Sequence, residues 1–299
     1  HAAPLVRAFY SALAAERSGA VRKAYAGALA AAARAASEKR FASLVDDAAG
    51  LYEDPGDDEA RARAGLILRE LARGAPDRLS GHMSAVLPLA FIARKEDDAA
   101  VAALWEEVWE GSTGSEAAAL AMHGPEVCDR VAAGLGSQKW EHKRQCARAV
   151  VAFAEHASPL GPHAPRLAAA LAAELPGRLW EGKEVVLAAL SSVAKACPAQ
   201  LKAAGGEPAR AVVAALVDGC GRKKRAFRDA SLEALEGALE ALKEGFEQCA
   251  ELLLDAASAP PAEAKAGAGA GAEPEGGEAA PLPLTPALKC LRAALAHAT

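Results

Sequence analysis

Aromatic residues are scarce in this chain of 299 residues. Phe, Trp and Tyr together make up 4% of it, although 52% of its residues are hydrophobic. Much of the apolar share is alanine, which favours helix but buries little surface per residue. One thick hydrophobic core is therefore not expected. Stacked helical repeats suit this composition better, because each repeat packs only on its neighbours and needs only small interfaces.

A basic excess is also absent, since 34 Lys and Arg residues stand against 39 Asp and Glu residues and give a net charge of −5. Proteins that bind nucleic acid usually carry a basic excess, so no nucleic-acid partner is expected. No apolar run approaches the roughly 18–20 residues that span a bilayer, so no membrane insertion is expected. No charged and apolar leader opens the chain, so we expect a cytoplasmic protein rather than a secreted one.

Cysteine pairs are missing too, because no C-x-x-C spacing occurs and the six cysteines stand singly in apolar stretches. They are Cys128, Cys146, Cys197, Cys220, Cys249 and Cys290. Disulfide frameworks belong to short secreted chains, so we expect reduced and buried thiols. His142 and Cys146 lie four residues apart, but zinc needs three or four ligands and no second pair is offered. We therefore expect no metal and no cofactor.

Catalytic motifs are equally absent. The seven histidines show no H-E-x-x-H spacing, and neither a G-x-S-x-G elbow nor a phosphate-binding loop occurs. The adjacent acids at 97–98 and 106–107 point to different helix faces and make no dyad. We expect no enzyme, no catalytic residue and no small-molecule substrate. An enzyme on a helical toroid is the weaker alternative, since it would need convergent acids, histidines or metal ligands in one cavity.

A repeat is present. A basic residue stands seven positions before an aliphatic one, with small residues between, and a degenerate copy runs from Val101 to Val108. The copies start at positions 22, 61, 101, 143, 183 and 228, which are 39, 40, 42, 40 and 45 residues apart. HEAT and armadillo repeats have periods of about 40–47 residues. Apolar residues within the copies follow helical spacing, as at Leu232, Leu235 and Leu239.

Each copy is predicted to be the second helix of a pair. The first helices are expected at about 39–52, 77–94, 115–135, 162–175 and 207–218, with Gly- and Pro-rich turns between them. The fold class is therefore all-α, a HEAT/armadillo-like α-solenoid of about seven antiparallel helix pairs with no β-sheet.

The end of the chain changes in composition. Ala, Gly, Pro and Glu fill residues 259–281 without large apolar residues, which predicts a disordered insertion. Thr285 and Pro286 then read as an N-cap and the first residue of a last helix. We expect a repeat array at 1–258, an insertion at 259–284, and a terminal helix at 285–299 that pairs with a helix near 244–257. The chain opens on His1 and a helix-spaced apolar set, so we expect a fragment cut inside a longer array.

Three segments, in their order and spacing, resemble the C-terminal part of the proteasome adaptor and scaffold family, which are very large HEAT-repeat proteins. They are LWEEVW at 104–109, GRLWEGKE at 177–184 running on to Cys197, and AFRDASL at 226–232. The resemblance is clearest over residues 85–243. It implies a scaffold that binds the 26S proteasome, links or stabilises its core and regulatory particles, and takes part in assembly quality control. A karyopherin-like HEAT transport receptor, with an acidic inner face and a small GTPase as partner, is the alternative.

The densest positive charge is the run 222–225, followed one turn later by Arg228 at the start of a helix. The helix dipole disfavours cations there. The run could be solvated or compensated within the chain by the helix's own Glu233 and Glu236 or a neighbouring repeat, it could be compensated by a partner's acidic surface, or it could serve as a nuclear-import signal. The first of these is favoured, and the last leaves a nuclear location open.

The four tryptophans are conspicuous in a chain so poor in aromatics. Trp105 and Trp109 share one helical face, and core filling is favoured over an exposed interface for the tryptophans as a group. The candidate partner-binding residues come from the second and third resembling segments and the basic run. They are Arg178, Trp180, Lys183, Arg222, Lys223, Lys224, Arg225 and Arg228.

Overall fold

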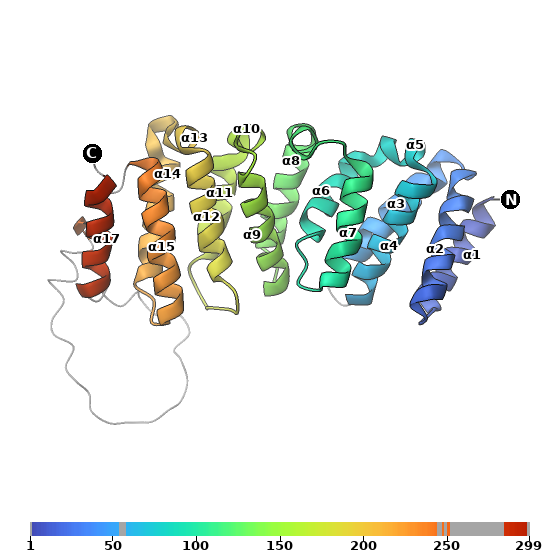
Figure 1. Cartoon of the computed structure of the whole chain (residues 1–299), viewed down its shortest axis with the longest axis horizontal. Coiled ribbons are helices and arrows are strands. Elements are labelled where there is room, and N and C mark those ends of the chain that lie inside the picture. The colour runs from blue at the N-terminus through green and yellow to red at the C-terminus, as the bar shows by residue number, and fades with distance from the viewer. Residues whose placement is uncertain (1, 54–57, 244–246, 248–249, 252–283, 298–299) are drawn as a thin grey trace, which may run out of the picture. The chain divides into compact units, whose positions relative to one another are not determined.

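The computed structural model describes residues 2–53, 58–243, 247, 250–251 and 284–297, and every regular element in these ranges is a helix. Many helices pack on helices that are near them in sequence, which confirms the predicted all-α repeat solenoid (Figure 1). The chain forms two compact units, residues 1–133 and 134–299. Among the described helices, none combines the length and apolar character needed to cross a membrane.

The first unit is built from helix pairs. Its elements are α1 (Ala2–Ala15), α2 (Gly19–Arg34), α3 (Glu38–Glu53), α4 (Asp58–Gly74), α5 (Pro76–Leu79), the 3₁₀ turn η1 (Ser80–His82), α6 (Met83–Ala93), α7 (Ala99–Ser112) and most of α8 (Glu116–Leu135). The second helices α2, α4 and α7 pack side by side in one layer. Helices α1, α3 and α6 pack against them from the other layer.

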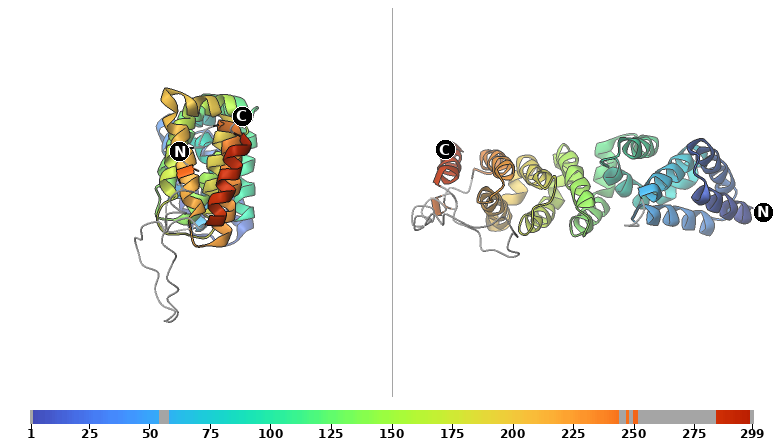
Figure 2. Two further views of the ribbon diagram at one scale, coloured as in Figure 1. Left: turned by 90° about the vertical axis from the view of Figure 1, so that its left-hand side faces the viewer. Right: turned by 90° about the horizontal axis from the view of Figure 1, so that it is seen from below.

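The second unit repeats this plan. Its elements are α9 (Trp140–Ala154), α10 (Ala157–Leu160), η2 (Gly161–His163), α11 (Ala164–Glu174), α12 (Glu184–Ala196), α13 (Pro198–Lys202), η3 (Ala204–Gly206), α14 (Glu207–Cys220), α15 (Arg225–Leu242) and α17 (Leu284–His297). Helices α9, α12 and α15 pack in sequence, with α11 and α14 behind them (Figure 2). Helix α17 packs mainly on α15.

The repeat motif marks the core. The aliphatic position that ends each copy is completely buried in every second helix: Leu29, Leu68, Val108, Val150, Leu190 and Leu235 are all 0% exposed. The spacing of seven residues is two helical turns, so it returns to the same face of the helix. The motif therefore predicted both the second helices and their inner face correctly.

The basic position of the motif also has a structural role. Arg22 donates from Nε to the backbone carbonyl of Glu16 at 2.6 Å, in the turn that precedes its own helix. Lys183 and Arg228 bind carbonyls of their preceding turns in the same way. These cations hold the turn between the two helices of a pair, which is why a basic residue recurs there.

Two further copies use a carboxylate instead of a carbonyl. Arg61 Nε lies 2.9 Å from Glu96 Oε1. Lys143 forms an ion pair with Glu174, and both side chains are largely buried. The motif cation therefore has a partner in each copy that carries one.

The aromatic residues fill the first unit's interior. Trp105 is 0% exposed and meets Tyr52 edge-to-face, with ring centroids 5.0 Å apart. Trp109 is buried and its ring centroid lies 5.4 Å from that of Phe91. The core-filling prediction is confirmed for these two tryptophans, whereas Trp140 and Trp180 in the second unit are only half-buried.

The predicted first helices agree with α3, α5–α6, α8, α11 and α14 to within a few residues. Helix α17 begins at Leu284, so Thr285 lies inside the helix and not at the predicted N-cap. The predicted insertion at 259–281, Cys249 and most of the predicted helix near 244–257 lie outside the described residues. The other five cysteines are buried and take part in no disulfide.

Candidate protein-binding surface

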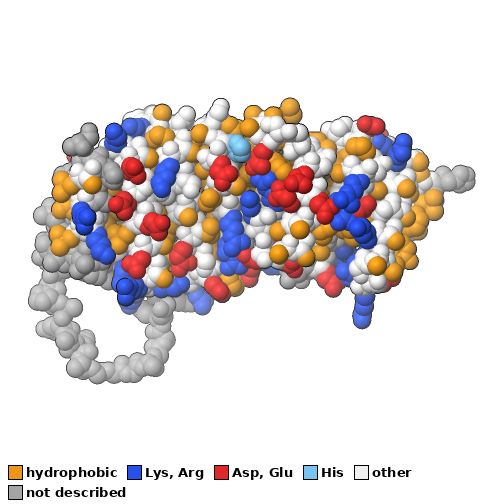
Figure 3. All heavy atoms as spheres, in the orientation of Figure 1, with side chains coloured by type: hydrophobic (Ala, Val, Ile, Leu, Met, Phe, Trp, Pro, Cys, Tyr) orange, Lys and Arg blue, Asp and Glu red, His pale blue; other side chains and the backbone are white. Residues whose placement is uncertain are grey.

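Two turns of the second unit bring most of the candidate residues together. One turn, residues 175–183, joins α11 to α12, and the other, residues 221–224, joins α14 to α15. Because α12 and α15 pack side by side and both begin at this end, the turns lie at the same lower end of the unit in Figure 1. Figure 3 shows Lys and Arg side chains at the lower end of α15, with Asp and Glu side chains nearby.

The turn before α12 is built around a buried cation. Lys183 is 1% exposed, and its Nζ donates to the carbonyls of Pro176 at 3.0 Å and Arg178 at 3.1 Å. Burial lowers the pKa of Lys183 to about 8. The nearby positive charges of Arg222 and Lys143 lower this pKa further, whereas the negative charge of Glu174 raises it. Gly177 and Gly182 turn the chain with φ of 79° and 81°. The turn thus wraps around the Lys183 ammonium.

This placement corrects one predicted contact residue. A partner cannot reach the Lys183 side chain, because the turn covers it and two carbonyls already accept its protons. Lys183 fixes the backbone that carries Arg178 and Trp180, which are exposed and half-buried respectively. Its effect on any partner is therefore indirect.

Arg222 fastens the second turn to the first. Its Nη2 donates to the carbonyl of Leu175 at 3.1 Å and to that of Gly177. Arg228 Nη1 in turn donates to the carbonyls of Arg222 at 3.3 Å and Lys223 at 3.0 Å. Both guanidinium groups are engaged within the unit, which offsets the dipole cost of cations at the start of α15.

Arg144 on α9 also supports the first turn, and the sequence patterns missed it. Its Nη1 donates to the Glu181 carbonyl at 3.0 Å, and its guanidinium lies 5.1 Å from the ring centroid of Trp140. A Cβ at Gly182 would lie only 2.9 Å from Arg144 Cδ, so glycine is needed there. Arg144 follows the motif residue Lys143 directly but carries no recurring pattern of its own.

Four basic side chains remain exposed on these turns and at the first residue of α15, and we call them the basic edge: Arg178, Lys223, Lys224 and Arg225. Lys224 Nζ lies 3.1 Å from Glu184 Oε1, and Arg225 Nε lies 3.5 Å from Asp229 Oδ2. Exposed ion pairs of this kind contribute at most about 1 kcal/mol, so a partner's carboxylates can replace them at little cost. The basic edge is thus suited to an acidic protein surface.

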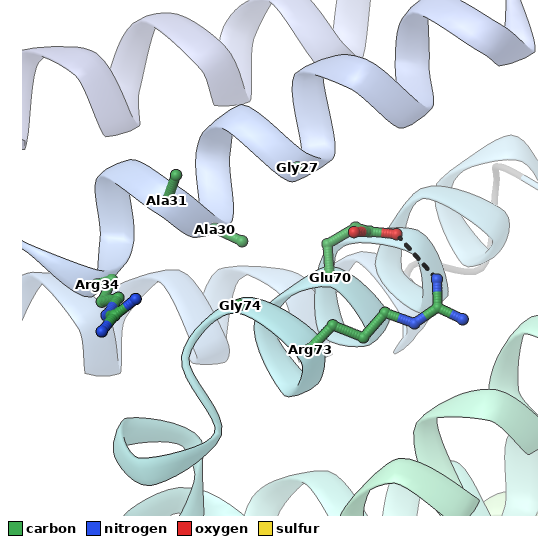
Figure 4. Close-up of a pocket in the computed structure, with 7 residues that line it drawn as sticks. All are labelled: Gly27, Ala30, Ala31, Arg34, Glu70, Arg73 and Gly74. Atoms are coloured by element: carbon green, nitrogen blue, oxygen red, sulfur yellow. Dashed lines mark ion pairs between the residues drawn. The ribbon is translucent and has the colours of Figure 1, made fainter.

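The first unit has a small hollow between α2 and α4 (Figure 4). It has a volume of about 400 Å³ and is lined by Gly27, Ala30, Ala31, Arg34, Glu70, Arg73 and Gly74. Arg73 and Glu70 are paired at 3.7 Å, as the dashed line shows, and Arg73 also meets Glu107 at 2.6 Å. The hollow follows from small residues at a close helix contact, and its paired charges are not poised for chemistry.

His142 and Cys146, the pair that the sequence offers as possible metal ligands, lie close together in the second unit. Cys146 Sγ lies 4.0 Å from His142 Nε2, and burial raises the pKa of Cys146 to about 12. Metals bind the thiolate, which so high a pKa disfavours. In the part of the chain that the structure describes, no three His, Cys, Asp or Glu side chains converge on one point.

No family model matches the chain. The chain is 26% identical over 238 residues to the proteasome adapter and scaffold protein ECM29 of Homo sapiens. The aligned stretch is 77% of this chain and 13% of ECM29, so this chain spans a small part of that protein's length. The similarity agrees with the resemblance of the three short segments and extends it over most of the chain. Together with the helical repeat fold, it is consistent with a non-enzymatic protein.

Proposed function

We propose that this chain is part of a protein-binding scaffold that associates with the 26S proteasome. The observation that carries the proposal is the similarity over 77% of the chain to ECM29, which is named as a proteasome adapter and scaffold protein. The repeat fold supports it, because stacked helix pairs present long surfaces that suit large protein partners.

The proposed role is to link or stabilise the core and regulatory particles and to take part in the quality control of their assembly. The expected location is the cytoplasm, with the nucleus as a second site. An array of packed pairs suits this role because its surface is extended and its turns are individually supported, as the turns held by Lys183 and Arg222 show.

The basic edge is the proposed contact within the second unit. Its four cations project from turns whose backbone is held by Lys183, Arg222 and Arg144, so the charges are presented on a fixed frame. Fixed positive charge facing an acidic surface speeds association and gives it salt dependence. Trp180 lies half-buried in the same turn and offers an aromatic group beside the charges.

The test is capture of purified 26S proteasome by the immobilised full chain. In one variant the four residues of the basic edge are replaced by glutamate. The control reverses four exposed cations of the first unit, Arg7, Arg17, Lys23 and Lys39, so both variants change the net charge equally. Helicity by circular dichroism should be unchanged in both, because none of the eight side chains is buried.

We expect capture to fall at least about tenfold for the basic-edge variant and to change little for the control, and wild-type capture to weaken with salt. Equal capture by both variants would remove the basic edge from the interface but leave the scaffold proposal. Failure of the chain and of the full-length protein to capture proteasome would overturn the proposal itself. Binding to a GTP-locked transport GTPase instead would favour the karyopherin-like alternative.

A further inference from the structure

Two cysteines that are about 70 positions apart in sequence meet where α17 docks on the second unit. Cys220 is the last residue of α14, and Cys290 lies in the first half of α17. Both are 0% exposed, and their thiols are hydrogen-bonded to one another.

We propose that Cys220 and Cys290 form a reversible disulfide that fastens α17 to the α14–α15 pair. The hydrogen bond between the thiols brings the two sulfur atoms together across the contact of α14 with α17, and a disulfide needs its sulfur atoms close together. The bond would join an element that packs on α15 and α14 to the body of the unit.

The pKa of Cys290 is shifted in the direction that favours reaction. The hydrogen bond from Cys220 lowers the pKa of Cys290, against the opposing effect of burial. Burial alone raises the pKa of Cys146, to about 12, and that of Cys197. The thiolate is the nucleophile in thiol chemistry, so Cys290 is the thiol that reacts first with an oxidant. Cys220, which also lies 3.3 Å from the Leu216 carbonyl, is the resolving thiol.

The oxidant in this scheme is a peroxide. The Cys290 thiolate attacks one oxygen of hydrogen peroxide, the O–O bond breaks, and Cys290 becomes a sulfenic acid while hydroxide takes up a proton to form water. The Cys220 thiolate then attacks the Cys290 sulfur and displaces the hydroxyl group as a second water. Two thiols and one peroxide thus give one disulfide and two waters. A dithiol reductant reverses the bond by exchange.

Helix α17 provides access for the oxidant. Leu288 and Leu295, seven positions apart on one face of α17, are 50% and 55% exposed, whereas Cys290 on another face is buried. A helix held on one side opens locally more readily than the core of the unit. Undocking exposes Cys290 to peroxide, and redocking returns it to Cys220, so the disulfide captures the docked state.

The test uses the full chain with Cys249 replaced by serine, because that cysteine lies outside the described residues. The chain is treated with hydrogen peroxide, blocked, and digested with trypsin without reduction. Cleavage after Arg210, Arg222, Lys289 and Arg292 places Cys220 in peptide 211–222 and Cys290 in peptide 290–292. We expect these two peptides to be linked, and the link to disappear with dithiothreitol.

The oxidised chain should also show hydrogen exchange in α17 slowed by about tenfold or more, because the bond prevents undocking. Cys220→Ser is the matched control, in which peroxide should leave α17 exchange unslowed. Cys128, Cys146 and Cys197 serve as internal controls, since each is buried like the pair and should stay reduced. Sulfinic acid at Cys290 beside a free Cys220 thiol, or a link from Cys290 to another cysteine, would overturn the proposal. The absence of any oxidation at Cys290 when the internal controls react would do the same.

Discussion

Arg222 donates a hydrogen bond to the carbonyl of Leu175, which precedes it by 47 residues, at 3.1 Å. With its second bond, to the Gly177 carbonyl, this guanidinium joins the turn before α15 to the turn before α12. The two turns that carry the basic edge are thus one connected structure, held by backbone acceptors rather than by opposite charges.

Replacing Arg222 by alanine should therefore destabilise the second unit. Two carbonyls lose a charged donor, and we expect the free energy of unfolding to fall by about 1–3 kcal/mol. Urea unfolding followed by circular dichroism measures this, and hydrogen exchange should rise at residues 175–183. Arg225→Ala is the control: its side chain is 87% exposed, so we expect a change below about 0.5 kcal/mol. Equal effects of the two substitutions would contradict the role assigned to Arg222.

The lowered pKa of Lys183 predicts that part of the chain's stability depends on pH. Its pKa in the folded chain is about 8, below the ordinary value of 10.5 that applies to the unfolded chain. Below pH 8 both states hold the proton, and between pH 8 and 10.5 only the unfolded state holds it. Stability contributed by this group therefore rises with pH across that window, by at most about 3 kcal/mol.

Other groups also titrate between pH 8 and 10.5, so the contribution of Lys183 is measured as a difference in the free energy of unfolding between two proteins. The free energy of unfolding of the wild type minus that of Lys183→Met should increase between pH 7.5 and pH 10. Lys202→Met, at an exposed position, controls for the loss of one lysine. A difference that stays constant or falls with pH would show that the buried ammonium is not destabilised by its surroundings.

Gly182 and Gly177 offer a matched pair of substitutions in one turn. Both have positive φ, so alanine costs about 1 kcal/mol of backbone strain at either position. A Cβ at Gly177 meets nothing within 4 Å, whereas one at Gly182 lies 2.9 Å from Arg144 Cδ. We expect Gly182→Ala to cost about 1–2 kcal/mol more than Gly177→Ala, because Arg144 must move and lose its bond to Glu181.

A double-mutant cycle isolates this contact. In an Arg144→Ala background, Gly182→Ala should cost no more than Gly177→Ala, because the obstacle is gone. If the excess cost at Gly182 persisted without Arg144, the strain would have to reside in the backbone of the turn. Thermal unfolding of the wild type, the three single variants and the double variant Arg144→Ala/Gly182→Ala distinguishes these two explanations.

The fold followed from the sequence because its signals repeat. Leu29, Leu68 and Leu190 recur at the same place in successive copies, and a residue that is buried in one copy is buried in the next. Trp105 was placed in the core for a related reason, since alanine-rich helices leave space that large side chains fill.

The candidate site was less predictable because spacing does not reveal partners. The sequence predicts Lys183 as a contact residue because it stands in the second resembling segment, yet two carbonyls of its own turn bind it. Arg144 was missed because its acceptor, the Glu181 carbonyl, lies 37 residues away. Every residue has a backbone carbonyl, so a sequence does not show which one accepts a hydrogen bond. The pairing of Cys220 with Cys290 depends in the same way on how α17 docks.

The turns before α2, α12 and α15 are each held by a cation bonded to main-chain oxygen. Every amino acid supplies that oxygen, so the exposed side chains of such a turn can vary while its shape persists, except where the backbone itself requires glycine, as at Gly182. Selection can then alter what the turn displays without rebuilding what supports it. A row of repeats organised in this way can exchange one binding partner for another by substitutions confined to a few exposed positions.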